Sequence, residues 1–261
     1  MTEERKPLCS VVIPAYNCED TIEEALRSAV DQTLGEIEIL VVDDASTDET
    51  GERVRHLAAK DSRIRLMRNE ENRGVAESRN RGVDAARADW VAFLDGDDAW
   101  LPQKLEKQFR LQRETGAAFL YTGAVCMSSR GETLERRFIP PERIDYRQLL
   151  RGNEIVCSSA LARRELLLAH PMTHSELHED YICWLQILKE GVTAHGLPEP
   201  LLRYRLAAKS KSRNKLKSAH MTWQCYAYLG IPWLKRCACF AGYVIHSVRR
   251  YFILFLNKKL T

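Results

Sequence analysis

Short apolar runs alternate with amphipathic helical patterns along the first hundred residues. Each run is rich in Val, Ile and Leu and has the length of a strand buried on both faces of a parallel sheet. The segments between the runs place apolar residues at helical spacing. The pattern therefore predicts an α/β fold with a mostly parallel, doubly wound sheet flanked by helices. The predicted strands are 8–13, 37–42, 64–67 and 90–94, and the predicted helices are 22–30, 46–60, 75–88 and 101–115.

Polar residues at the boundaries of these runs indicate where helices begin. Asp20, followed three residues later by Glu23, has the pattern of a capping box for the first helix. Pro102 fits the first turn of the fourth helix, and Asp98 is a candidate cap for it.

The pattern is looser from about residue 117 onward. It predicts a strand at 117–127, helices at 161–169 and 181–189, a strand at 201–206, and helical structure after residue 218. We expect a domain over 1–218, with halves at 1–115 and 116–218, and a basic, aromatic helical tail over 219–261.

Composition narrows the class of protein. The chain has 261 residues, of which 45% are hydrophobic and 29% charged, enough for one large domain with a substantial core. The net charge is only +3, and no nucleic-acid-binding module is recognisable, so no nucleic-acid partner is predicted. Eight Cys occur without a Cys-x-x-Cys pair, which argues against a zinc site and for buried, reduced thiols.

The N-terminal segment and the lengths of the apolar stretches indicate where in the cell the protein is located. The N-terminus MTEERKPL is charged and is not followed by an apolar core of the signal-peptide type. No stretch reaches about 18 uninterrupted apolar residues, so no transmembrane helix is predicted. Residues 240–256 come nearest, and they are interrupted by His246, Arg249 and Arg250. We expect a cytoplasmic protein.

Polar residues gather where the first, second and fourth strands are predicted to end. In parallel sheets, ligands bind beyond the carboxyl ends of the strands, so these residues should share one rim. Three carboxylates within four positions repel one another, which predicts a positive partner. Asp95 and Asp97, which are separated by a single residue, could hold a divalent cation. The alternative is a polar turn in which Asp98 caps the next helix. The three groups are Pro14-Ala15-Tyr16-Asn17, Asp43-Asp44 and Asp95-Gly96-Asp97-Asp98.

Two further stretches carry candidate chemistry. In 72–82, Arg73 and Asn80 are candidates for contact with phosphates, whereas Arg81 fits a solvated helix face. In 178–184, a carboxylate such as Asp180 could act as a general base. An acidic pair at a helix N-terminus is the simpler alternative there.

Taken together, these motifs resemble family 2 glycosyltransferases, whose nucleotide-diphospho-sugar-binding fold is called GT-A. Order and spacing match across residues 8–206, and five motifs in order are a specific signal. The tail, with Tyr204-Arg205 and the basic run that follows, resembles bacterial enzymes that build capsule, teichuronic-acid or O-antigen polysaccharides. The motifs are SVVIPAYN at 10–17, VVDDASTDET at 41–50, NRGVAESRNRG at 72–82, FLDGDDAWLPQKLEKQ at 93–108 and HEDYICWL at 178–185.

The resemblance implies a role for each group. Asp44 would read the base, usually uracil, and Asp95 with Asp97 would hold Mg²⁺ or Mn²⁺ against the diphosphate. Asp180 would be the catalytic base that deprotonates the acceptor hydroxyl. The nucleotide-binding residues would be Pro14, Ala15, Tyr16, Asn17, Asp44, Arg73, Asn80, Asp95 and Gly96, and Asp98, Glu179 and Trp184 would lie on the acceptor side. In this assignment, 1–115 is the nucleotide-binding half and 116–218 the acceptor-binding half.

One position departs from the family pattern. Many relatives carry His two residues after a Tyr-Arg pair, and this sequence has Ala207 there. If that His contacts the metal or the diphosphate in relatives, Lys211 or Arg213 could supply the positive charge instead.

The implied reaction is a single displacement that inverts the anomeric carbon. The sugar would pass from a UDP-sugar to a glycan or a polyprenyl-diphosphate-linked glycan in cell-surface polysaccharide biosynthesis. A non-catalytic sugar-nucleotide-binding or scaffold subunit is the alternative. A sugar nucleotidyltransferase is disfavoured because the loop PAYNCED lacks the Gly expected of a phosphate-binding loop.

The tail has two interpretations. Aromatic and basic residues alternate along 219–261, which is typical of a peripheral contact with the inner face of the plasma membrane. Packing on the core or on a second subunit of a homo-oligomer is the alternative.

Overall fold

Ten strands form one sheet in the computed structural model, which describes residues 6–206 and 215–256. Eight of them follow the order β3-β2-β1-β4-β9-β6-β10-β5, with β7 paired to β6 and β8 to β10. The strands are β1 Cys9–Ala15, β2 Ile37–Asp43, β3 Ile64–Arg68, β4 Trp90–Phe93, β5 Ala99–Trp100, β6 Phe119–Met127, β7 Thr133–Phe138, β8 Arg143–Ile144, β9 Leu161–Arg163 and β10 Ala194–Arg205. The helices are α1 Ile22–Val30, α2 Thr50–Ala58, α3 Val75–Ala85, α4 Lys104–Thr115, α5 Tyr146–Leu149, α6 Arg164–Ala169, α7 Glu179–Lys189, α8 Lys215–Tyr228 and α9 Trp233–Leu256, with a 3-10 turn η1 at Cys157–Ser159.

The N-terminal half of the sheet is parallel, as predicted. Strand β1 lies between β2 and β4 and runs parallel to both, with Ala15 opposite Asp43 and Val12 opposite Phe93. The carboxyl ends of these strands therefore meet at one edge of the sheet. The other half is mixed, because β9 pairs antiparallel with both β4 and β6, whereas β6 and β10 run parallel.

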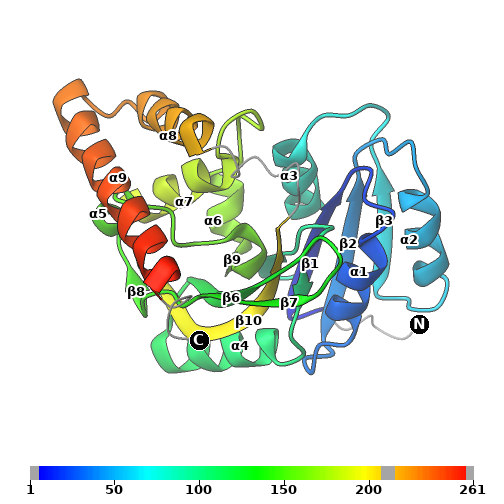
Figure 1. The fold of residues 1–261 in the computed structure, drawn as a ribbon. Helices are drawn as coiled ribbons and strands as arrows, with labels where there is room; N and C mark the ends of the chain where they lie inside the picture. Colours follow the sequence, from blue (N-terminus) through cyan, green and yellow to red (C-terminus); the bar gives the residue numbers. More distant parts are fainter. Residues whose placement is uncertain (1–5, 207–214, 257–261) are drawn as a thin grey trace.

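Helices cover both faces of the sheet (Figure 1). Side chains alternate along each strand, so neighbouring residues of β1 enter different cores. Val11 and Ile13 pack with Ile22, Leu26 and Leu105, from α1 and α4. Val12 belongs to the opposite core, which also contains side chains from α3, α6, α7 and α8. This arrangement confirms the doubly wound architecture expected from the alternating pattern.

The predicted cap of the first helix and the predicted start of the fourth are wrong. Helix α1 has Thr21 as its N-cap residue and no side-chain cap, so Asp20 and Glu23 do not form a capping box. The Thr21 hydroxyl instead donates a hydrogen bond to the Gly96 carbonyl. Helix α4 begins at Lys104 with Gln103 as N-cap, which leaves Pro102 ahead of the helix. Asp98 lies too far upstream to cap it.

The second half departs further from the predicted elements. The predicted helix 161–169 is a short strand, β9, followed by helix α6. The predicted strand 201–206 is the end of β10, which begins at Ala194. Strands β5, β7 and β8 were not predicted, because two of them have only two residues and the third is mostly exposed.

The C-terminal segment is helical, as expected, and part of it packs on the core. Met221, Cys225 and Tyr226 of α8 are buried in the same cluster as α7. Helix α9 lies along the edge of the molecule opposite α2 (Figure 1). None of the helices described here is long and apolar enough to cross a membrane. All eight Cys are free thiols, and five are buried.

Candidate functional site

The loops that follow β1 and β2 are bonded to each other at the carboxyl edge of the sheet. The Asn17 amide donates to the Ser46 hydroxyl at 3.1 Å, and the Thr47 amide donates to the Asn17 side-chain oxygen at 2.9 Å. The Asp44 amide donates to the Ala15 carbonyl at 2.8 Å. Asn17 takes a left-handed conformation, with φ of 46°. This pairing fixes one wall of the rim and leaves Tyr16 half-exposed upon it.

Asp44 is buried and holds the loop that leads into α3. Its carboxylate accepts hydrogen bonds from the Arg73 amide at 3.0 Å, the Gly74 amide at 2.8 Å and the Asn69 side chain at 2.6 Å. Asp44 therefore joins the wall formed by β2 to the start of α3. Its contact with a base stays a prediction.

The acidic turn after β4 is held from three sides. The Asp95 amide donates to the Ser158 hydroxyl at 3.1 Å. The Gly96 carbonyl accepts from Thr21, and a Cβ at Gly96 would lie 3.0 Å from the Cys18 sulfur. Close approach of the first loop therefore favours glycine at this position.

Arg205 holds the other end of the acidic turn. Its amide donates to the Asp98 carboxylate at 2.8 Å, and its Nε donates to the Asp97 carbonyl at 2.6 Å. Asp98 is buried, so it anchors β10 to the turn and does not cap α4.

The crowding of carboxylates has the expected electrostatic effect. Burial and the neighbouring Asp95 raise the pKa of Asp97 to about 6. Burial, with Asp97 and Asp95 beside it, also raises the pKa of Asp98. A cation at the turn would relieve this repulsion.

The residues at the turn fit a divalent cation that is shared with a phosphate ligand. Asp95 and Asp97 offer hard oxygen donors, and Asp95 is partly exposed. Within residues 6–206 and 215–256, no group of three or more His, Cys, Asp or Glu could hold a metal ion alone. Mg²⁺ commonly binds through one or two carboxylates with phosphate and water completing its shell, which suits a two-carboxylate turn.

A buried arginine joins the acidic turn to a second acidic pair. Arg79, on α3, donates from Nη2 to Asp95 at 2.6 Å and from Nη1 to Glu179 at 2.8 Å. Only 4% of its side chain is exposed. Burial opposes its charge, yet Asp95 and Glu179 hold its pKa well above the ordinary value. Residues about a hundred positions apart are thus brought into one ionic cluster.

Asp180 lies next to Glu179 in the first turn of α7. Its carboxylate accepts a hydrogen bond from the Tyr181 amide at 2.7 Å. Burial and the charge of Glu179 raise its pKa to about 6, although Arg79 and His178 act in the opposite direction. A carboxylate with this pKa is ionised at neutral pH and is a stronger base than an ordinary Asp.

Arg73 and Asn80 have different surroundings. The Arg73 side chain is half-exposed, with its Nε 3.9 Å from Glu71. The side-chain amide of Asn80 is bonded to Met172, whose carbonyl accepts a hydrogen bond from it and whose N–H donates one to it. Asn80 therefore fixes the segment that leads to α7, and its contact with a phosphate stays a prediction.

Trp184 has a packing role in this structure. It is fully buried, and its ring centroid lies 4.8 Å from that of Phe119 and 6.1 Å from that of Phe93. It therefore belongs to the core beneath the site and does not line an open acceptor pocket. Ala207, Lys211 and Arg213 lie outside the described residues.

Sequence reasoning missed two residues that organise the site, Arg79 and Arg205. Arg79 follows Ala76 by three positions and precedes Val83 by four, so the helical pattern places a charge on the buried face of α3. A charged residue at such a position is rarely buried unless it is paired. That was the available signal for Arg79. Arg205 lies in the recognised Tyr204-Arg205 pair, but its partners across the sheet could not be read from sequence.

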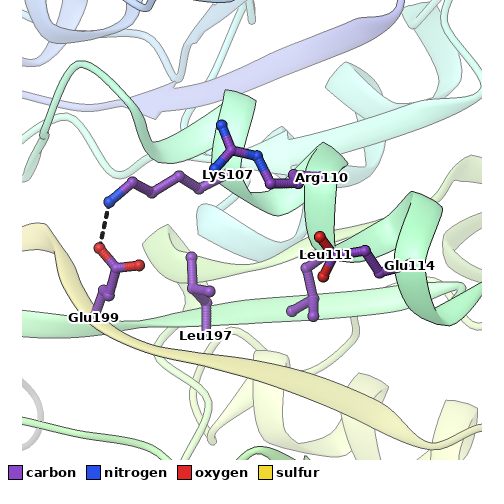
Figure 2. A pocket seen from close by; sticks show the side chains of 6 residues that line it. All are labelled: Lys107, Arg110, Leu111, Glu114, Leu197 and Glu199. Carbon is purple, nitrogen blue, oxygen red and sulfur yellow. Dashed lines mark hydrogen bonds and ion pairs between the residues drawn. The ribbon is translucent and has the colours of Figure 1, made fainter.

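The hollow between α4 and β10 lies apart from these carboxylates. It measures about 230 Å³ and is lined by Lys107, Arg110, Leu111, Glu114, Leu197 and Glu199 (Figure 2). Lys107 and Glu199 form an ion pair across it. It contains none of the residues at the carboxyl edge of the sheet. The candidate functional site is therefore the acidic cluster and not this hollow.

Comparison with known proteins identifies the family. The model of the family described as "Glycosyl transferase family 2" matches residues 10–169, which include the strand-end loops, Arg79 and the acidic turn. The chain belongs to glycosyl transferase family 2.

This transferase has relatives of nearly the same length. It is 37% identical over 246 residues to TuaG of Bacillus subtilis (strain 168), a proposed teichuronic acid biosynthesis glycosyltransferase, with 94% of this chain and 98% of TuaG covered. It is 32% identical over 255 residues to WfgD of Escherichia coli, with 97% and 98% covered. WfgD is named a UDP-Glc:alpha-D-GlcNAc-diphosphoundecaprenol beta-1,3-glucosyltransferase.

A solved structure shows the fold of the transferase. The mannosyltransferase PcManGT of Pyrobaculum calidifontis, in complex with GDP-Man and Mn²⁺, has a TM-score of 0.67 and 18% identity. The match covers 98% of this chain and 81% of that one. At 18% identity, this structural similarity shows that the two proteins share a fold, which is the GT-A fold.

Proposed function

We propose that this transferase moves a sugar from a UDP-sugar to a hydroxyl of a glycan or a polyprenyl-diphosphate-linked glycan, with inversion at the anomeric carbon. The observation that carries the proposal is the cluster at the carboxyl edge of the sheet. Arg79 binds Asp95 on one side and Glu179 on the other, so the proposed metal-binding turn and the proposed base lie on one framework.

The donor would lie along the edge formed by the loops after β1, β2 and β4. Pro14, Ala15, Tyr16 and Asn17 with Asp44 would contact the nucleoside, and the half-exposed Arg73 would contact the nucleotide. Asp95 and Asp97 would hold Mg²⁺ or Mn²⁺, which supplies positive charge to the departing nucleoside diphosphate. Gly96 allows the first loop to approach the turn, because a side chain there would meet Cys18.

Asp180 would take the proton from the acceptor hydroxyl as its oxygen attacks the anomeric carbon. Its raised pKa supports this role, because a general base works best when its pKa is close to the operating pH. The attacking oxygen forms a bond to the sugar as the bond to the diphosphate breaks, and the proton passes to Asp180. No covalent sugar–enzyme intermediate is needed, so no Ser or Cys nucleophile is assigned.

The named relatives support the setting. The name of WfgD specifies UDP-Glc and a lipid-diphosphate-linked acceptor, and TuaG is assigned to teichuronic acid biosynthesis. We infer a role in cell-surface polysaccharide biosynthesis at the inner face of the plasma membrane. PcManGT was solved with Mn²⁺, which supports a divalent cofactor.

A donor screen tests the proposal. The purified protein would be titrated with UDP-, GDP- and dTDP-sugars in the presence of Mn²⁺, Mg²⁺ or EDTA, and slow donor hydrolysis would be followed. We expect binding of a UDP-sugar that EDTA abolishes. The variant Asp97→Asn should gain no donor binding from Mn²⁺ or Mg²⁺. Asp61→Asn changes a partly buried carboxylate that pairs with Arg63 in the loop before β3, and it should bind the donor as the wild type does. Absence of binding to every nucleotide sugar by folded protein would reject the proposal.

A further inference from the structure

Helix α9 has an inward face that is fixed to the rest of the molecule. The Phe240 ring centroid lies 5.4 Å from that of Trp223 on α8, and Gly242 lies against Arg151. The His246 imidazole pairs with Glu154, in the segment after α5. These contacts set the rotation of the helix about its axis, so the opposite face is directed outward.

That outward face is apolar over its described length. The exposed apolar residues of this face recur at spacings of three or four residues, so they form one stripe along the helix. Single exposed apolar residues are ordinary, but a continuous stripe on an otherwise packed helix indicates an interaction surface. The outer stripe consists of Leu234, Ala238, Ala241, Val244, Ile245 and Val248, all of them exposed.

The charge around the outer stripe favours one kind of partner. No Asp or Glu follows Glu199 in the sequence, whereas Lys235 is exposed on α9, and Arg249 and Arg250 follow Val248 in the same helix. Two copies of this helix packed together would bring like charges close. An anionic lipid surface instead offers hydrocarbon to the stripe and negative headgroups to the basic residues.

The N-terminal end of α9 has a further feature of interfacial helices. Trp233 and Leu234 are 64% and 80% exposed, directly before Lys235. Tryptophan favours the boundary between headgroups and hydrocarbon, because its ring is apolar and its indole N–H is polar.

We propose that α9 lies in the plane of an anionic bilayer, with the outer stripe inserted below the headgroups. Helices of this type bury the apolar face by about 5–10 Å, without crossing the membrane. The proposal rests on the proposed function in one respect: a lipid-linked acceptor gives the enzyme a reason to bind this surface. The geometry of the stripe is independent of that function.

Vesicle co-sedimentation of the full chain tests the proposal. One set of vesicles contains phosphatidylcholine alone, and the other contains phosphatidylcholine with phosphatidylglycerol. We expect binding to the anionic set, weaker binding as salt is raised, and little binding to the neutral set. Ile245→Glu should lower the partition coefficient by roughly tenfold or more, because it removes a buried apolar side chain and adds a negative charge.

A matched control lies directly after β7. Ile139 is 55% exposed and Ile245 is 56% exposed, so Ile139→Glu makes the same change at nearly the same exposure outside α9. We expect Ile139→Glu to bind vesicles like the wild type. Equal binding by the wild type and Ile245→Glu, or equal binding to neutral and anionic vesicles, would overturn the proposal.

Light scattering on the same variants separates a lipid surface from a second copy. A wild-type dimer that becomes monomeric in Ile245→Glu, with no vesicle binding in either, would assign the outer stripe to self-association and overturn the proposal. Donor hydrolysis in solution should be equal in the wild type and Ile245→Glu. Vesicle binding without any donor turnover would reject the proposed function and leave the lipid contact standing.

Discussion

Two acidic pairs of this transferase face the same buried arginine, and they are built in different ways. In the turn after β4, Arg79 binds Asp95 and the pKa of Asp97 is raised to about 6. At the start of α7, Arg79 binds Glu179 and the pKa of Asp180 is raised to about 6. In each pair, one carboxylate is neutralised by the arginine and its neighbour is left a stronger base.

The supports of the two pairs differ. The turn is held by main-chain bonds to Ser158 and Arg205, so its carboxylates are fixed relative to the sheet. Glu179 and Asp180 instead take their place from α7, whose preceding segment is tied to α3 through Asn80 and Met172. In the proposed reaction, one pair would hold a ligand against the sheet, and the other would take a proton from a second substrate. The comparison teaches that one buried arginine can join two carboxylate pairs that are positioned independently.

The largest expected effect separates the roles of the two pairs. Asp180→Asn should lower turnover by about 10²–10⁴-fold, because the acceptor hydroxyl loses its base. Donor affinity and metal dependence should be unchanged, because the turn after β4 is untouched. Steady-state kinetics and donor titration measure the two quantities. A variant with unimpaired turnover would remove Asp180 from the reaction.

Removal of the shared arginine should disturb both pairs at once. Arg79→Met leaves Asp95 and Glu179 without their buried partner, which should lower the free energy of unfolding by about 3 kcal/mol or more. Urea denaturation measures this loss. Arg113→Met makes the same change at an exposed position of α4 and should cost within about 0.5 kcal/mol. Equal stability of the two variants would contradict the ionic cluster.

A smaller effect is expected from the glycine of the acidic turn. Gly96→Ala would place a methyl group 3.0 Å from the Cys18 sulfur and 3.3 Å from the Pro14 carbonyl, costing about 1–3 kcal/mol. Donor affinity should fall with it, whereas the Glu179–Asp180 pair should be unaffected. Gly35→Ala, which has no neighbour within 4 Å, is the matched control for thermal unfolding and donor titration. No difference between the two would show that the turn can move.

The smallest effect is a displacement of the pH profile. Asp180 accepts a proton only when ionised, so wild-type turnover should fall as the pH is lowered through about 6. Glu179→Gln removes the negative neighbour that raises this pKa, so the acid limb should move to lower pH. A pH series of turnover measures it, with Glu176→Gln, an exposed residue of the preceding loop, as control. An acid limb that moves to higher pH in Glu179→Gln would contradict the conclusion that the charge of Glu179 raises the pKa of Asp180.

The sequence predicted the parallel half of the fold well. The runs at β1, β2 and β4 are apolar because both faces of these strands are buried, and that burial gives a clear local signal. The second half was predicted less well. Strand β9 has three residues and pairs with β4 and β6, so its structure depends on neighbours far away in the chain.

The helix caps show the same limit. Asp20 and Asp98 have the residue types of caps, but Thr21 takes the N-cap position of α1, and the Asp98 carboxylate accepts a hydrogen bond from the Arg205 amide instead. A local sequence pattern indicates which hydrogen bonds a side chain is able to form, whereas its tertiary neighbours determine which of them it does form.

The sequence by itself determined the family, the alternation of strands and helices, and the location of the acidic residues at strand ends, because each follows from local spacing. Only the tertiary structure decided that Arg79 joins Asp95 to Glu179 and that Trp184 and Asn80 serve packing and loop anchoring. It also decided that the outer stripe of α9 is exposed. The physical reason is that burial and ion pairing depend on which distant segments meet, and spacing along the chain does not encode that directly.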